Sequence, residues 1–219
     1  MGFFLEERYY IIYTWFNKEF LVHLLAITIG LLIALGLEAS VEWVHHRRLV
    51  REARENIFQE IRDNERNVAG ELNALPTERS HLRKTLEAVS NPPSHRQTEF
   101  NEDFKWTFTR LNASGWEASL STGAVAHMSY QEAKRYSELY ALQRLFNENM
   151  DRYVQKRGEM YAFLSLTKGP GKPAPDLELE AGKRSIAEEI VIGDFLREIG
   201  HTLAEQYRSI GQQQNEFSR

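Results

Sequence analysis

The sequence contains no cysteine, which excludes disulfides, thiolate metal ligands and cysteine nucleophiles together. The formal net charge is only −4, so the chain lacks the basic excess typical of proteins that bind nucleic acid, and we expect no nucleic-acid partner. Proline is scarce as well. None of the six prolines lies before residue 76, between residues 94 and 169, or after residue 175. Because proline interrupts helices at a cost of roughly 3 kcal/mol, these stretches leave room for long helices.

Charged side chains are absent from residues 20–37, FLVHLLAITIGLLIALGL, which are bounded by Glu19 and Glu38. As a helix this segment would be about 27 Å long, close to the ~30 Å hydrocarbon core of a bilayer. The alternative is a buried helix of a soluble domain. Aromatic residues crowd the N-terminal flank, as they do at bilayer interfaces, and this favours a membrane span. We assign residues 1–19 to an interfacial amphipathic segment and residues 20–37 to a transmembrane helix.

Two sets of residues are expected to act in the membrane. Small residues at every fourth position of the span would let a second helix approach closely, whether from another integral membrane protein or from a second copy of the chain. They are Ala26, Gly30 and Ala34. Aromatic and cationic residues on both sides of the span would contact lipid headgroups. They are Tyr9, Tyr10, Tyr13, Trp15, Phe16, Trp43, Arg47, Arg48 and Arg51.

The orientation of the span is indicated by its flanking cations. Two precede it, at Arg8 and Lys18, whereas four follow it within the next turns, from Arg47 to Arg54. Cytoplasmic flanks carry the excess of lysine and arginine, so this count places the C-terminal domain in the cytoplasm of a bacterial inner membrane. A periplasmic domain is the alternative.

After the span, apolar residues recur at steps of three and four, the period of amphipathic helices, and no stretch alternates as a strand would. We predict an all-α fold with a juxtamembrane helical rod at 38–75, which Pro76 kinks or ends, and an antiparallel helical bundle at 76–219. Within the bundle we expect a short helix at 98–112, a capping box formed by Ser129 and Glu132, and a linker at 167–176.

Two blocks of the sequence resemble a family of bacterial single-pass membrane proteins. The first block contains residues 29–35 (IGLLIAL), Trp43 and the run REAREN at 51–56, followed by Glu60 and Asn64. The second is WEASLSTGA at 116–124. The function of this family is uncharacterised, so the resemblance implies an N-terminal span and a C-terminal helical domain but no activity. Many members begin with basic residues, which implies the opposite orientation, whereas this chain has Glu6, Glu7 and Arg8.

Candidate chemistry is limited to the spacing Glu-x-x-His, which occurs at 42/45, 78/81 and 198/201. Helical bundles that bind two metal ions use such pairs, and only the second and third pairs could meet in a bundle. We expect solvated helix faces instead, with no metal, cofactor or catalytic residue. The sequence STGA at 121–124 lacks the frame of a phosphate loop, and we expect a close helix contact through Gly123 and Ala124 instead.

Three functions follow as hypotheses. The first is a non-enzymatic single-pass membrane protein that serves as a structural or accessory subunit of a larger membrane complex or of a homo-oligomer. The second is a membrane-anchored sensor with a ligand-binding bundle. The third is a bundle metalloprotein.

Overall fold

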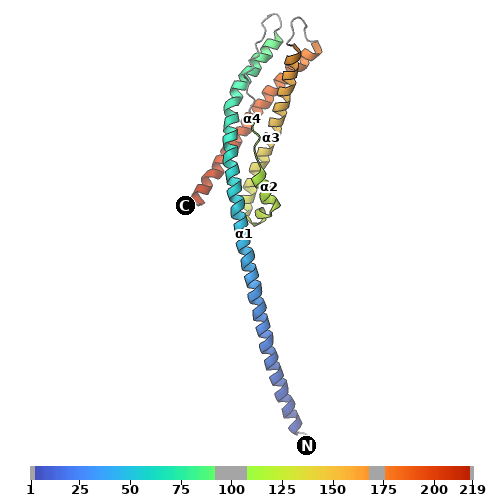
Figure 1. The fold of residues 1–219 in the computed structure, drawn as a ribbon, viewed down its shortest axis with the longest axis vertical. Helices are drawn as coiled ribbons and strands as arrows, with labels where there is room; N and C mark the ends of the chain where they lie inside the picture. Colours follow the sequence, from blue (N-terminus) through green and yellow to red (C-terminus); the bar gives the residue numbers. More distant parts are fainter. Residues whose placement is uncertain (1–2, 92–107, 168–175, 218–219) are drawn as a thin grey trace. The chain divides into compact units, whose positions relative to one another are not determined.

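The computed structural model describes residues 3–91, 108–167 and 176–217, with side chains described for 18–91, 108–165 and 176–212. These residues form four α-helices and one 3-10 helix, together with the loops between them (Figure 1). They are α1 (Phe3–Ser90), α2 (Ser114–Ser121), η1 (Ala124–His127), α3 (Tyr130–Thr167) and α4 (Asp176–Phe217). No described residue belongs to a strand, so the predicted all-α class is confirmed. The chain divides into two compact units, residues 1–51 and 52–219.

Helix α1 continues through Pro76 without a break, so the helix does not end where the proline suggested it might. Proline removes one backbone hydrogen bond and crowds the preceding turn, but this local effect competes with packing. Leu75 and Leu82 are buried on either side of Pro76, with exposed fractions of 5% and 4%. We attribute the helicity of this segment to the apolar contacts that hold both flanking turns in the bundle.

The second unit is built around three long helices: the part of α1 from residue 52 onward, α3 and α4. Helix α1 contacts α3 in a parallel sense, because Arg54 bonds to Glu132 whereas Glu78, further along α1, bonds to Arg157. Helix α4 runs antiparallel to both. The parallel pairing of α1 and α3 was not anticipated.

Apolar side chains at helical spacing form the core of the second unit, as the periodicity predicted. From α1, Ala53, Ile57, Ile61 and Val68 are buried; from α3, Tyr136, Leu139, Phe146, Met150, Tyr153, Met160 and Leu164; from α4, Ile186, Leu196, Ile199, Leu203 and Tyr207. One end of the core joins all three helices through Leu82, Met160, Phe163, Leu164 and Ile186.

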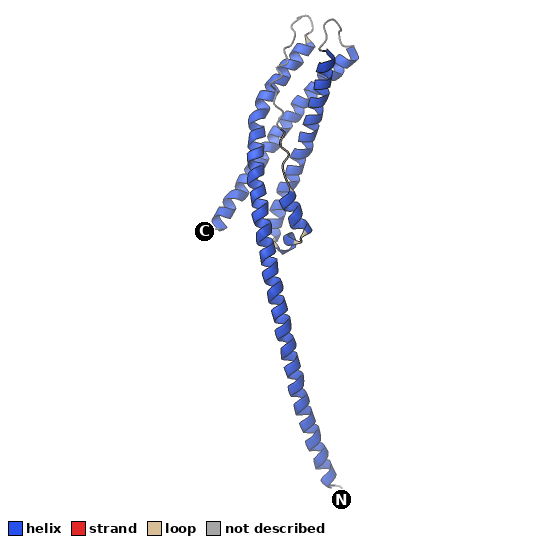
Figure 2. Ribbon diagram, viewed as in Figure 1, coloured by secondary structure: helices blue, strands red, loops and turns tan. Residues whose placement is uncertain are grey.

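The segment that precedes α2 differs from its prediction. Residues 108–113 form no helix, so the helix expected at 98–112 is wrong for this part, while the remainder of that prediction lies outside the described residues. Figure 2 shows these residues as a loop between helices. Residues 168–175 of the expected linker are likewise outside the described residues.

At the start of α3, one of the two hydrogen bonds of the predicted capping box is formed. The backbone N–H of Glu132 donates to Oγ of Ser129 at 3.3 Å. The Glu132 carboxylate does not complete the capping box, because it forms a bidentate ion pair with Arg54 of α1 at 2.6 and 2.7 Å. A tertiary contact therefore replaces the local one.

Of the two residues expected to make a close helix contact, Ala124 is fully buried, whereas Gly123 makes no such contact; the close approach of α2 to α1 lies at Gly115. A Cβ atom on Gly115 would stand 3.3 Å from the backbone of Asn56, so α2 approaches α1 closely here and a larger residue would require the neighbouring backbone to shift slightly. Gly123 has open space around it and a φ of +77°, which shows that its role is to adopt a left-handed conformation in the turn.

Candidate functional site

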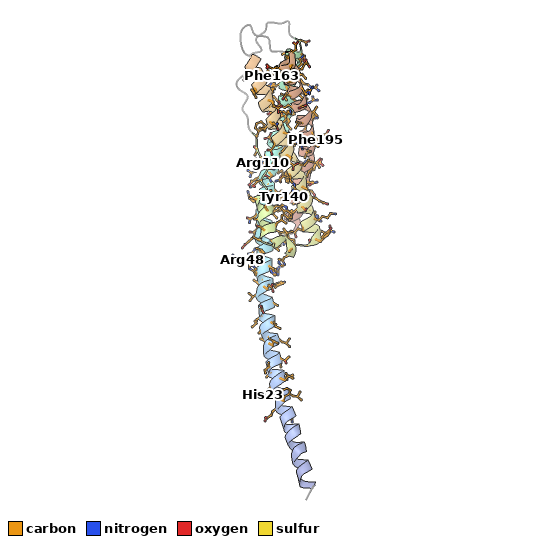
Figure 3. All side chains as sticks on the ribbon, turned by 90° about the vertical axis from the view of Figure 1, so that its right-hand side faces the viewer. His23, Arg48, Arg110, Tyr140, Phe163 and Phe195 are labelled. Atoms are coloured by element: carbon orange, nitrogen blue, oxygen red, sulfur yellow. The ribbon has the colours of Figure 1, made fainter. Side chains whose placement is uncertain are left out.

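The first candidate surface is the apolar segment of α1 that precedes the bundle. Its window of 18 residues has a mean hydropathy of 2.6, and none of that window is buried. The large apolar side chains of Ile27, Leu32 and Leu37 are 63–69% exposed, and Figure 3 shows the side chains around His23 projecting from the helix. By length and composition this segment is a candidate membrane span, because water does not favour such exposure of apolar area.

The residues predicted for helix packing are all on this segment and all exposed. They are Ala26, Gly30 and Ala34. A Cβ atom on Gly30 would meet nothing within 4 Å, so the face that carries them is uncovered within the described chain.

The predicted interface anchors fall into two groups. Tyr9, Tyr10, Tyr13, Trp15 and Phe16 lie in α1, but their side chains are outside the described residues. Trp43, Arg47, Arg48 and Arg51 are exposed. The guanidinium of Arg47 lies over the ring of Trp43, 4.7 Å from its centre, which joins an aromatic and a cationic anchor into one group. Apolar exposure also continues past the predicted end of the span, to Val41 and Val44.

The second candidate region is a set of polar side chains that we name the connector clamp: the buried Asn64, Glu71 and Gln143, and the half-buried Asn147. The clamp binds the backbone of residues 108–113, which we name the connector. Within the described residues no strand lies beside the connector to bond with its backbone N–H and carbonyl groups. Asn64 donates to the carbonyl of Asn112 at 2.7 Å and accepts from its N–H at 2.9 Å. Asn147 holds the N–H and the carbonyl of Leu111 in the same way, at 3.0 and 2.9 Å.

The other two members complete the clamp. Glu71 accepts from the N–H of Thr109 at 3.1 Å, and burial raises the pKa of its carboxyl while that bond opposes the shift. Gln143 donates to the carbonyl of Asn112 at 2.7 Å, and its own carbonyl accepts from Tyr207 of α4 at 2.7 Å. The clamp therefore links α1, the connector, α3 and α4 through side-chain amides and a carboxylate.

Glu60 accepts a hydrogen bond from the N-terminal turn of α2. Ala113 precedes that helix and gives it no side-chain cap. The carboxylate of Glu60 accepts instead from the N–H of Gly115 at 2.8 Å, and from Tyr140 at 2.5 Å. A negative charge at a helix N-terminus is favourable, so α1 caps α2 from outside. Trp116 is then held flat against Tyr140, with ring centres 5.4 Å apart.

The third candidate region is an ion cluster of three buried residues, Tyr153, Arg157 and Glu189, and the half-buried Glu78. Nε of Arg157 donates to Glu189 at 2.5 Å, and its terminal nitrogen Nη2 donates to Glu78 at 3.0 Å and to Tyr153 at 2.6 Å. Tyr153 in turn donates to Glu78 at 2.7 Å. The side chains of Arg157 and Glu189 are 1% and 0% exposed. Burial raises the pKa of Glu189 to about 7, although Arg157 opposes this shift.

Sequence reasoning overlooked the ion cluster and part of the clamp, although a signal was present. Gln143 lies on the apolar stripe of α3 between Leu139 and Phe146, and Arg157 occupies the same stripe. A polar residue at a core position of an amphipathic helix must find a buried partner, so such an interruption marks a network.

An open groove of about 750 Å³ lies beside the clamp, between the connector with α2 on one side and α3 on the other. Its wall carries both signs of charge. It is lined by Arg110, Leu111, Asn112, Ala113, Ser114, Trp116, Glu117, Leu120, Tyr140, Gln143, Arg144, Asn147 and Glu148. Figure 3 places Arg110 and Tyr140 on this part of the bundle.

The Glu-x-x-His pairs do not come together as a metal site in the described part of the chain. Glu78 is engaged by Tyr153 and Arg157, while His81 and His201 are exposed. Among the described residues, no group of three or more histidines, aspartates or glutamates is placed to hold a metal ion.

Comparison with known proteins yields no match to any protein-family model, to any curated protein or to any solved structure. The candidate regions are therefore interpreted from their own geometry.

Proposed function

We propose that the chain is a non-enzymatic single-pass membrane protein whose helical bundle serves as a structural or accessory subunit of a membrane assembly. The observation that carries this proposal is the apolar segment of α1, none of which is buried, in a chain whose second unit has a packed apolar core of its own. Such a segment is stable in a bilayer, where no water opposes its exposure.

The buried polar groups of the bundle support a structural role. Glu60 caps α2, the connector clamp holds residues 108–113, and the ion cluster ties α1, α3 and α4 together. These groups are engaged with backbone and side chains of the same chain, and each fixes the position of one element on another. The bundle is thereby suited to present a defined surface to a partner.

For the membrane setting we propose a bacterial inner membrane, with the bundle in the cytoplasm. The exposed cations after the span support this orientation, because anionic lipid and the usual distribution of lysine and arginine favour the cytoplasmic side. Trp43 and Arg47 would then lie at the headgroups. Cysteine substitutions at exposed positions, labelled from one side of sealed vesicles, would report the orientation directly.

The partner is proposed to dock on the face that carries Ala26, Gly30 and Ala34, either from other integral membrane proteins or from further copies of the chain. The experiment is extraction in mild detergent of the chain tagged after Arg219, followed by native mass spectrometry. A stoichiometric complex would support the proposal and show which kind of partner binds. A monomer without a co-purifying protein would refute it.

A matched pair of variants tests the docking face. Gly30→Ile adds a branched side chain to this face. Gly36→Ile adds the same volume on a different face, because six residues at about 100° each leave its side chain about 120° away around the helix axis. Neither position has an atom within 4 Å of a new Cβ in the described chain. We expect the complex to be lost in Gly30→Ile and retained in Gly36→Ile; equal behaviour would contradict docking through this face.

A sensor is the second candidate, and the groove beside the connector clamp favours it. A groove of about 750 Å³ that carries Arg110, Arg144, Glu117 and Glu148 suits a small ligand with both charges. Equilibrium dialysis of the protein against a bacterial small-molecule extract, with mass spectrometry, tests this. Retention by the wild type and loss of retention in Arg144→Ala would support a sensor, and equal retention by both would count against it.

A further inference from the structure

Two carboxylates, the buried Glu189 and the partly exposed Glu78, share one buried guanidinium in the ion cluster. Arg157 bonds to Glu189 at 2.5 Å and to Glu78 at 3.0 Å, and Glu189 is wholly buried. Glu71 of the connector clamp, 9% exposed, is a third carboxylate near the same guanidinium. Taking a charge out of water is expensive unless an opposite charge compensates it, so the described carboxylates of this layer outnumber their buried cation.

The remaining charged groups around Glu189 are nearer to water. On α1, Arg79 forms an ion pair with Asp194 of α4 at 2.7 Å, and both side chains are about one-third exposed. On α4, Arg197 contacts Asp194 at 3.8 Å and is 42% exposed. On α3, Tyr153 lies against the cluster and donates to Glu78. Arg79 and Arg197 are both paired with Asp194, so these two cations stabilise the negative charge of Glu189 only weakly.

One oxygen of Glu189 is not used by these contacts. Oε1 accepts from Arg157, whereas Oε2 is buried and has no hydrogen-bond partner among the described residues. Glu189 also lines a cavity of about 10 Å³, together with Leu75, Arg79, Tyr153 and Asp194. That volume matches a single water molecule, and the wall offers the polar groups that a buried water requires.

We propose that Glu189 is a buried proton-binding site, through which the packing of α4 on α1 and α3 responds to pH. The proton binds Oε2 and is hydrogen-bonded by one water in the cavity. In this state Arg157 keeps its ion pair with Glu78. When the proton leaves, Glu189 adds a negative charge to a layer in which Glu78 and Glu71 already lie near the same guanidinium, and the contact between the three helices is weakened. This inference does not depend on membrane attachment.

The sign of the effect follows from the pKa of Glu189, which burial raises from its ordinary value to about 7. The folded protein therefore binds more protons than the unfolded chain between these two values. Under proton linkage, the stability of the bundle falls as pH rises through this window and is level above it.

The direct test is infrared difference spectroscopy of the full chain in detergent, recorded while pH is changed from about 5 to about 9, a range that brackets the raised pKa. A protonated carboxylic acid gives a carbonyl band that disappears on ionisation. We expect such a band to titrate near neutral pH in the wild type, to be absent in Glu189→Gln and to be retained in Glu198→Gln, a change at an exposed position of the same helix.

Thermal unfolding of the same three proteins supplies the second readout. The unfolding temperature of the wild type and of Glu198→Gln should fall as pH rises toward neutral, whereas that of Glu189→Gln should change less. Absence of the band from the wild type, or its persistence in Glu189→Gln, would overturn the proposal. The wild-type titration decides the first point even if Glu189→Gln does not fold.

Discussion

Replacing Asn64 by aspartate is the sharpest test of the connector clamp, because it changes one atom of a buried side chain. The amide orientation is fixed by the connector: the carbonyl of Asn112 requires a donor, and its N–H requires an acceptor. Aspartate keeps the acceptor. It removes both donated bonds, to Asn112 at 2.7 Å and to Gln143 at 3.1 Å, and it turns a carboxylate oxygen toward two carbonyl oxygens.

The loss in the free energy of unfolding that Asn64→Asp can cause has an upper limit. Asn64 is 1% exposed, so an ionised aspartate there would be desolvated and repelled. The protein can avoid this by protonating the carboxyl, which at about pH 7 costs about 4 kcal/mol for an ordinary pKa near 3.9. The protonated form still lacks one donated hydrogen bond, worth about 1 kcal/mol. We therefore expect Asn64→Asp to lower the free energy of unfolding by about 3–5 kcal/mol near neutral pH.

The assay is urea unfolding of the full chain in mild detergent, followed by circular dichroism at several pH values. The aspartate pKa is raised in the folded state, so the loss of stability should shrink to about 1 kcal/mol as pH falls toward 4. Asn73→Asp, at an exposed position of the same helix, is the control and should change stability by less than about 0.5 kcal/mol. A loss below about 1 kcal/mol for Asn64→Asp at neutral pH, or a loss independent of pH, would refute the clamp.

Two further predictions use the same unfolding assay. Gly115→Ala places a Cβ 3.3 Å from the backbone of Asn56 and should destabilise the bundle by about 1–3 kcal/mol, whereas Gly158→Ala meets nothing within 4 Å and should stabilise it by about 0.5–1 kcal/mol; effects of the same sign would contradict the close contact. Arg157→Met leaves the buried Glu189 without its guanidinium and should destabilise by about 3–5 kcal/mol near neutral pH, with a smaller loss in acid where Glu189 is protonated. A loss that grows on acidification would be the wrong sign for this account.

Much of the secondary structure was predictable, because it depends on local patterns. The helical period placed the buried stripes of α1, α3 and α4 correctly, and Ser129 marked the start of α3. Two local signals misled. Pro76 is tolerated inside α1 because apolar contacts on either side outweigh one lost hydrogen bond. A short helix was predicted at 98–112, yet the backbone of Leu111 and Asn112 bonds to side chains that lie far away in sequence, and residues 108–113 form no helix.

What the sequence determined by itself is therefore the all-α class and the apolar segment at 20–37, since helical periodicity and a run without charge are properties of neighbouring residues. Only the tertiary structure decided how Asn64, Glu60 and Arg157 are used. Their partners come from other helices, and whether a buried polar group is satisfied depends on three-dimensional placement rather than on spacing along the chain. The same reason explains the unusual carboxyl of Glu189: its environment is formed only when α1, α3 and α4 pack around it.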